Sequence, residues 1–126
     1  SHWITPVGER RRFDTRFLVA VAPPEQEPLH DGGETIESLW VLPEDALRRA
    51  SAGELQMFPP TTANLRWLSR FGAADEAVAE AISSPSPSPI LPRVRLDDSG
   101  RVTGVALPRD SDYESVPLPE FVIGKR

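Results

Sequence analysis

The sequence has no cysteine among its 126 residues, which excludes disulfide bonds and thiolate metal sites. A chain without cysteine fits a reducing compartment, and we expect a cytoplasmic protein. Long apolar runs are missing too, since none approaches the roughly 18 residues that cross a bilayer. Positive charge is in short supply: 14 Lys and Arg stand against 19 Asp and Glu, which gives a net charge of −5. This balance disfavours nucleic acid and anionic membranes as partners.

The short motifs that identify common catalytic sites are also absent. The chain has no P-loop, no G-x-G-x-x-G, no G-x-S-x-G and no H-E-x-x-H. The function must therefore be sought in clusters of charged side chains.

Proline is present in excess, with 14 residues in 126, about twice the usual share of roughly 5%. The stretch S-S-P-S-P-S-P-I-L-P at 83–92 is typical of an extended, poorly packed linker. It predicts one domain at 1–82 and a C-terminal part at 93–126. There, Arg93–Leu96 and Arg101–Leu107 flank the turn D-D-S-G and predict a β-hairpin, followed by an irregular tail. An isolated hairpin is marginally stable in water, so we expect this part to dock on the domain.

The longest apolar run, Arg12–Pro24, predicts a central strand covered on both faces, because valine and phenylalanine dominate it. Trp3-Ile4 predicts a short strand that could pair with it as a hairpin, and Ile36–Leu42 predicts another strand. Since the chain starts at Ser1, so close to a strand, we expect further sequence upstream.

Three helices are predicted between these strands and the linker. Pro43 fits a first helical position, with acids in the first turn, arginines late, and Gly53 as the end. Thr61 or Thr62 can cap a second helix, and Ala73–Ile82 predicts a third. Three large aromatic residues are expected in the core: Trp40, Trp67 and Phe71.

A basic cluster occupies the start of the long strand, formed by Arg10, Arg11, Arg12 and Arg16. Arginine forks bind phosphate in a bidentate manner, so Arg12 or Arg16 could contact a phosphate. Alternatively, Asp14 forms an ion pair with one of them, since residues two apart share a strand face. Because the apolar run follows at once, we expect Asp14 and Arg16 to be partly buried at the rim of a cleft.

Acidic residues gather before the next strand, with Glu34 and Glu37 after a Gly-Gly turn. Such carboxylates could hold Mg²⁺ or act as a base, or they could belong to a solvated acidic loop. The two histidines, His2 and His30, are expected to be structural or solvated.

Taken as an ordered set, several short runs resemble the C-terminal half of a Nudix hydrolase. More narrowly, they resemble bacterial relatives of the peroxisomal Nudix enzymes that cleave coenzyme A and its acyl derivatives. The resemblance covers about Ser1–Phe71. Its motifs, in chain order, are W-I-T-P at Trp3–Pro6, R-R-F-D-T-R-F at Arg11–Phe17, H-D-G-G-E at His30–Glu34, E-x-x-W at Glu37–Trp40, P-x-x-A-L at Pro43–Leu47 and P-P-T at Pro59–Thr61.

The resemblance implies an α/β/α sandwich with a mixed sheet, in which Mg²⁺ or Mn²⁺ lets water attack a diphosphate. In the family, glutamates of the Nudix box hold the metal, and this sequence has no such box, no Glu-Glu pair and no R-E-x-x-E. The box precedes the W-x-T-P strand in the family, so the catalytic half is expected to be missing from this chain. The resemblance therefore implies no catalytic residue, no metal ligand and no metal bound by this chain alone. It does imply substrate-binding residues, namely Arg12, Phe13, Asp14, Arg16, Glu34 and Glu37.

These inferences lead to an α+β fold, part of a Nudix-type sandwich with a C-terminal hairpin. The first functional hypothesis is the C-terminal part of a Nudix diphosphatase acting on coenzyme A or a nucleoside diphosphate derivative. The second is a non-catalytic Nudix-like scaffold, and the third is a regulatory domain that binds an anionic ligand at the arginine cluster. The expected partners are a phosphorylated small molecule and either a second copy or the missing N-terminal half, because lost sheet neighbours would leave an unpaired edge.

Overall fold

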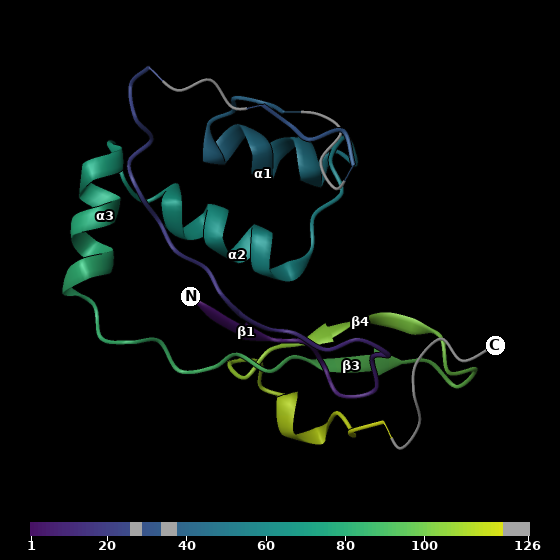
Figure 1. Ribbon diagram of the computed structural model, residues 1–126. Helices are drawn as coiled ribbons and strands as arrows, with labels where there is room; N and C mark the ends of the chain where they lie inside the picture. The colour runs from purple at the N-terminus through teal and green to yellow at the C-terminus, as the bar shows by residue number, and fades with distance from the viewer. Residues whose placement is uncertain (26–28, 34–37, 120–126) are drawn as a thin grey trace. The chain divides into compact units, whose positions relative to one another are not determined.

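A computed structural model describes residues 1–25, 29–33 and 38–119 (Figure 1). The predicted α+β class is confirmed, with three helices and two small antiparallel sheets among these residues. The sandwich with a mixed sheet stays an expectation, because the described residues supply only these two sheets. In chain order the elements are β1 (His2–Ile4), β2 (Asp14–Arg16), α1 (Pro43–Ser51), α2 (Pro59–Leu68), α3 (Ala74–Ser83), β3 (Arg93–Leu96), β4 (Val102–Ala106) and the 3₁₀ helix η1 (Tyr113–Ser115).

The chain divides into two compact units. The first contains both sheets and combines Ser1–Leu18 with the chain from Ser86 onward. The second contains the three helices and runs from Val19 to Pro85. The division at 1–82, 83–92 and 93–126 stays a prediction.

In the first unit, β1 is the central strand. It pairs with antiparallel β2, with Trp3 opposite Thr15. On its other side Ile90 forms an isolated parallel bridge, in which the Ile4 N–H donates to the Ile90 carbonyl and the Ile90 N–H donates to the His2 carbonyl, both at 2.9 Å. Trp3 is 3% exposed between these neighbours. The predicted linker is thus exposed only as far as residue 89, and its last residues pack into this unit.

The predicted long central strand over Arg12–Pro24 is wrong. Only Asp14–Arg16 forms a strand, and the apolar residues after it are largely exposed, Leu18 at 93% and Val21 at 56%. β1 is three residues long, so the pairing ends where Phe17 donates its N–H to the Ser1 carbonyl at 2.8 Å. Strand propensity reflects fit to neighbouring strands, and a β-rich run without a neighbour forms no ladder.

The predicted strand Ile36–Leu42 is not formed by its described part. Ile36 and Glu37 lie outside the described residues, and residues 38–42 form no strand. Trp40 is 75% exposed, so its assignment to the core is wrong within the described part of the chain. Whether a second copy or an N-terminal half covers this surface stays a prediction, which light scattering would test.

The second sheet is the predicted C-terminal hairpin. β3 and β4 pair antiparallel, with a register shift between Arg95 and Leu96. The Asp97 carboxylate holds the turn, because its Oδ1 accepts the backbone N–H groups of Ser99 and Arg101, both at 2.9 Å. The Ser99 hydroxyl also donates to it, and these hydrogen bonds lower the pKa of Asp97. Gly100 completes the turn at φ +78°, a left-handed conformation that favours glycine.

Helix α1 begins as predicted at Pro43, with acids in its first turn and arginines in its last. The start of α2 is different: it begins at Pro59, and no threonine side chain caps it. Proline suits a first turn, since its φ is already helical and its missing N–H would have no partner there. The Pro-Pro pair thus starts the helix that Thr61 or Thr62 was expected to cap.

The helices share a thin core. α1 and α2 pack against each other (Figure 1), and the fully buried side chains among described residues 19–85 are two alanines, Ala46 and Ala77. Trp67 and Phe71 are half-buried and form an edge-to-face pair with ring centroids 4.8 Å apart. Across the described residues, no helix has the length and apolarity that a membrane crossing requires.

Candidate functional site

Four of the predicted substrate-binding residues lie along β2 and just before it, from Arg12 at the loop end of the β1–β2 hairpin to Arg16 opposite His2. Thr5 continues the pairing beyond the strands, since its N–H donates to the Phe13 carbonyl and its Oγ1 accepts the Phe13 N–H, both at 2.9 Å. The Thr5 carbonyl accepts from Arg12 Nε at 3.0 Å. One threonine thereby holds Arg12 and Phe13 in place, and the Arg12 terminal nitrogens remain available to a ligand.

Asp14 is paired with His2 and not with an arginine. The register places His2 opposite Arg16 and diagonal to Asp14 on the same face of the hairpin. His2 Nε2 lies 2.5 Å from Asp14 Oδ1. His2 is 6% exposed and Asp14 is exposed, so the histidine is the buried, structural member of the pair. The ion pair of Asp14 with Arg12 or Arg16 is therefore not formed, and the cross-strand histidine was the partner that sequence reasoning missed.

The expected partial burial of Asp14 and Arg16 is also wrong. All of β2 is exposed, because the residues after it do not continue the sheet. Arg16, like Arg10 and Arg11, makes no ion pair with any residue that the structure describes. Phe13 is 62% exposed beside them. This part of the hairpin is thus an exposed, positively charged surface on which the Phe13 ring is accessible, and it is not an enclosed cleft.

Two further predicted site residues, Glu34 and Glu37, lie outside the described residues. The structure brings Arg12, Phe13, Asp14 and Arg16 together on one hairpin. Water has free access to this surface, which limits the strength of any single charge interaction. Several guanidinium groups on one short segment can nevertheless bind a polyanionic ligand jointly.

A divalent metal, which the resemblance implies, does not fit the described residues. Within 1–25, 29–33 and 38–119, no three His, Asp or Glu side chains converge into a group that could hold an ion. Mg²⁺ needs carboxylate and other oxygen ligands in near-octahedral geometry. We therefore derive no chemical step through a metal on this part of the chain.

A second arginine cluster, which sequence reasoning missed, ties the C-terminal tail to β3. Arg93 NH1 donates to the carbonyls of Glu114 and Val116 at 3.1 and 3.0 Å. Its NH2 donates to Glu114 Oε2 at 2.7 Å, and its guanidinium stacks on Tyr113 with Cζ 4.4 Å from the ring centroid. The Tyr113 hydroxyl in turn donates to the Leu91 carbonyl at 2.8 Å.

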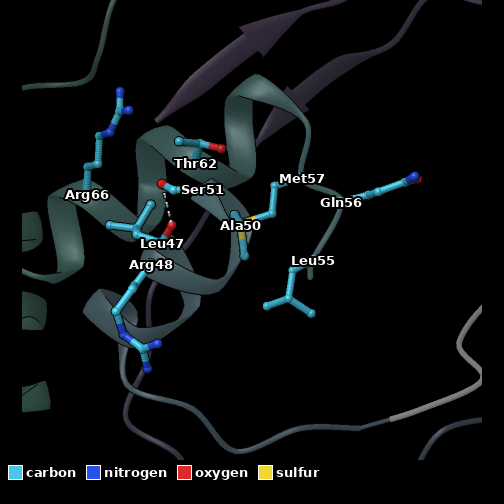
Figure 2. Close-up of a pocket in the computed structure, with 9 residues that line it drawn as sticks. All are labelled: Leu47, Arg48, Ala50, Ser51, Leu55, Gln56, Met57, Thr62 and Arg66. Carbon is cyan, nitrogen blue, oxygen red and sulfur yellow. Dashed lines mark hydrogen bonds between the residues drawn. The ribbon is translucent and has the colours of Figure 1, made fainter. Parts of the chain in front are cut away.

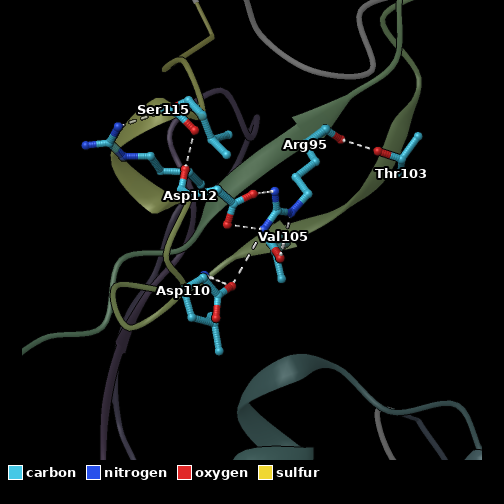
Figure 3. A network of polar contacts seen from close by, with 9 residues as sticks. Arg95, Thr103, Val105, Asp110, Asp112 and Ser115 are labelled. Atoms are coloured by element: carbon cyan, nitrogen blue, oxygen red, sulfur yellow. Dashed lines mark hydrogen bonds and ion pairs between the residues drawn. The ribbon is translucent and has the colours of Figure 1, made fainter.

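Arg95 makes a parallel set of contacts two residues along β3 (Figure 3). Its NH1 and NH2 donate to the two Asp112 carboxylate oxygens, and Asp110 lies 3.7 Å from NH2. The hydrogen bond from Arg95 lowers the pKa of Asp112, and the same bond raises the pKa of Arg95. The sequence contained a signal for this cluster. Two arginines, at 93 and 95, are spaced two residues apart, and three acids, at 110, 112 and 114, have the same spacing. All of these groups are engaged with one another, so the cluster is structural.

Comparison with known proteins finds similarity to an enzyme of coenzyme A derivatives. The chain is 32% identical over 83 residues to the acyl-coenzyme A diphosphatase NUDT19 of Gallus gallus, in a match that includes 60% of this chain. The match includes 21% of the Gallus gallus protein, so the chain spans a small part of that relative's length. No family model matches the chain, and no solved structure matches it. The similarity supports a relationship to Nudix-type hydrolases.

Proposed function

We propose that this chain is the C-terminal part of a Nudix-type hydrolase that cleaves a diphosphate bond in coenzyme A or another nucleoside diphosphate derivative. The observation that carries the proposal is the 32% identity over 83 residues to an acyl-coenzyme A diphosphatase. The ordered motifs from Trp3–Pro6 to Pro59–Thr61 support it. In this proposal the chain alone is inactive, and the Mg²⁺ or Mn²⁺ ligands belong to another part of the protein.

The role proposed for this chain is substrate binding along β2 of the β1–β2 hairpin. Coenzyme A is a polyanion that carries an adenine ring. The free nitrogens of Arg12 and the exposed guanidinium of Arg16 suit phosphate oxygens, and the exposed Phe13 ring suits a base. Asp14 acts here as a positioning residue, since its carboxylate is bound by His2.

The test compares the isolated chain with the longer parent protein, each with Mg²⁺ and coenzyme A or ADP-ribose. We expect hydrolysis by the parent and none by the chain. In the parent, Arg12→Ala should raise KM by about tenfold with little change in kcat, because a charge-assisted hydrogen bond is worth about 1.5–3 kcal/mol. Arg70→Ala, at an exposed site just beyond the end of α2, is the matched control. Metal-dependent turnover that stays with the purified chain would overturn the proposal.

A second candidate is a non-catalytic Nudix-like scaffold that binds an anionic ligand. It is favoured by Arg10, Arg11 and Arg16, which are exposed and form no ion pair with described residues. Calorimetry with ADP separates the two candidates: a parent protein that binds ADP but hydrolyses neither substrate would support the scaffold.

A further inference from the structure

An open groove lies between α1 and α2 in the helical unit. It has a volume of about 630 Å³, within the range of small-molecule sites. Its walls come from both helices and from the connector between them (Figure 2). The lining residues are Leu47, Arg48, Ala50, Ser51, Leu55, Gln56, Met57, Thr62 and Arg66.

The apolar part of the groove is aliphatic and half-buried. Leu47 and Ala50 come from α1, and Leu55 and Met57 from the connector. Methionine is flexible and polarisable, so it adapts to aliphatic partners of different shape. These side chains leave apolar area open to water, which an aliphatic group could cover with a gain in free energy.

The charge of the groove has one sign, although the chain as a whole carries −5. No acidic residue lines it. Arg48 is already engaged, since its NH2 lies 3.0 Å from Asp45 Oδ1. Arg66 forms no ion pair with any residue that the structure describes, and Figure 2 shows the two guanidinium groups extending in different directions. Thr62 lies four residues before Arg66, so its hydroxyl and the Arg66 guanidinium are on one face of α2.

We propose that the α1–α2 groove binds an amphiphilic anion, an aliphatic chain that ends in an acidic head group. The chain covers Leu47, Leu55 and Met57, and the head group accepts hydrogen bonds from Arg66 and Thr62. The single sign of charge and the adjacent apolar wall together select this ligand class over a neutral lipid or a bare anion. The proposal does not depend on the Nudix assignment.

The test uses Met57, which is the single methionine of the chain. Labelling with [¹³C-methyl]methionine gives one NMR signal inside the groove. The 126-residue chain is titrated with octyl phosphate, with 1-octanol as the chain without the head, and with inorganic phosphate as the head without the chain. We expect a saturable shift with octyl phosphate, at least tenfold weaker binding of octanol, and no shift with phosphate.

Two variants identify the head-group contact. Arg66→Gln should weaken octyl phosphate binding about tenfold and leave octanol unaffected, because it removes a charge-assisted hydrogen bond. Arg70→Gln, four residues later, beyond the end of α2 and outside the groove, should change neither. The proposal is overturned if octyl phosphate gives no saturable shift, if octanol binds equally well, if phosphate alone shifts the signal, or if Arg70→Gln weakens binding as much as Arg66→Gln. Octanoate in a parallel titration shows whether a carboxylate head serves as well as a phosphate.

Discussion

The two hairpins of this protein carry arginines in similar patterns and use them in opposite ways. In β1–β2, Arg16 projects from an exposed strand and finds no carboxylate among the described residues, because the nearest acid is bound by His2. In β3–β4, Arg93 and Arg95 face an acidic tail that returns along the strand and binds both of them. The difference shows that an arginine-rich strand is a candidate ligand surface only where no acidic side chain of the same fold pairs with its arginines.

The tail supplies more than charge to the second hairpin. Val116 is 8% exposed, and the carbonyl that Arg93 binds belongs to this residue. The Arg93 side chain is itself only 18% exposed. Hydrogen bonds that are shielded from water contribute more to stability than exposed ones. Among the residues that the structure describes, no segment covers the arginines of the first hairpin in this way, so we expect its charges to matter for binding and not for folding.

Among the variants that test this comparison, Arg93→Ala should have the largest effect on stability. The substitution removes three hydrogen bonds and the stacking on Tyr113, and it leaves the Val116 carbonyl without its donor. We expect the free energy of unfolding to fall by about 1–3 kcal/mol, which urea denaturation would measure. Arg93→Lys is the control, because it keeps the charge but cannot reproduce the planar fork. A lysine variant as stable as the parent would show that charge alone holds the tail.

A smaller effect is expected from Asp112→Asn, and it should depend on pH. Arg95 lowers the pKa of Asp112 in the folded state, so the folded protein holds a proton there less readily than the unfolded chain does. The pair therefore contributes stability above the unfolded pKa of about 3.9, and this contribution is lost as the pH falls through the folded value. The melting temperature of the variant should be lower than that of the parent at neutral pH, and the gap should close in acid.

The control for this pH dependence is Asp98→Asn, in the exposed turn of the same hairpin. Asp98 makes no hydrogen bond with a described residue, so its replacement should leave the melting curves nearly superimposed. Thermal unfolding between about pH 7 and pH 3 covers the relevant range. A gap between Asp112→Asn and the parent that stays constant across this range would contradict the ion-pair explanation.

The smallest effect is expected at the first hairpin. Arg16→Ala should change the free energy of unfolding by less than about 0.5 kcal/mol, because the side chain is exposed and no described residue pairs with it. Arg10→Ala, in the turn, should behave in the same way. Chemical denaturation of both variants measures this. A loss at Arg16 as large as that at Arg93 would show that the first hairpin also uses its arginines for folding, and the contrast between the two would disappear.

Sequence reasoning predicted the locally specified elements well. Pro43 and the charges of the first and last turns located α1, the D-D-S-G turn located the β3–β4 hairpin, and the alanine-rich stretch located α3. These elements depend on interactions within a few residues, such as helix-dipole pairing and turn hydrogen bonds. The assignment of Arg12, Phe13, Asp14 and Arg16 to a substrate site stays a prediction.

Only the tertiary structure determined the contacts between segments that are distant in the sequence. Trp3 is buried because Ile90 pairs with β1 from the far end of the predicted linker, and the apolar run after Arg16 stays exposed because β1 is too short to pair with it. His2 reaches Asp14 through the register of β1 on β2, and Arg93 and Arg95 meet acids about twenty residues later. Each of these pairings is set by backbone hydrogen bonds and packing between segments that no local pattern relates, so composition could predict a strand or a charge cluster but not its partner.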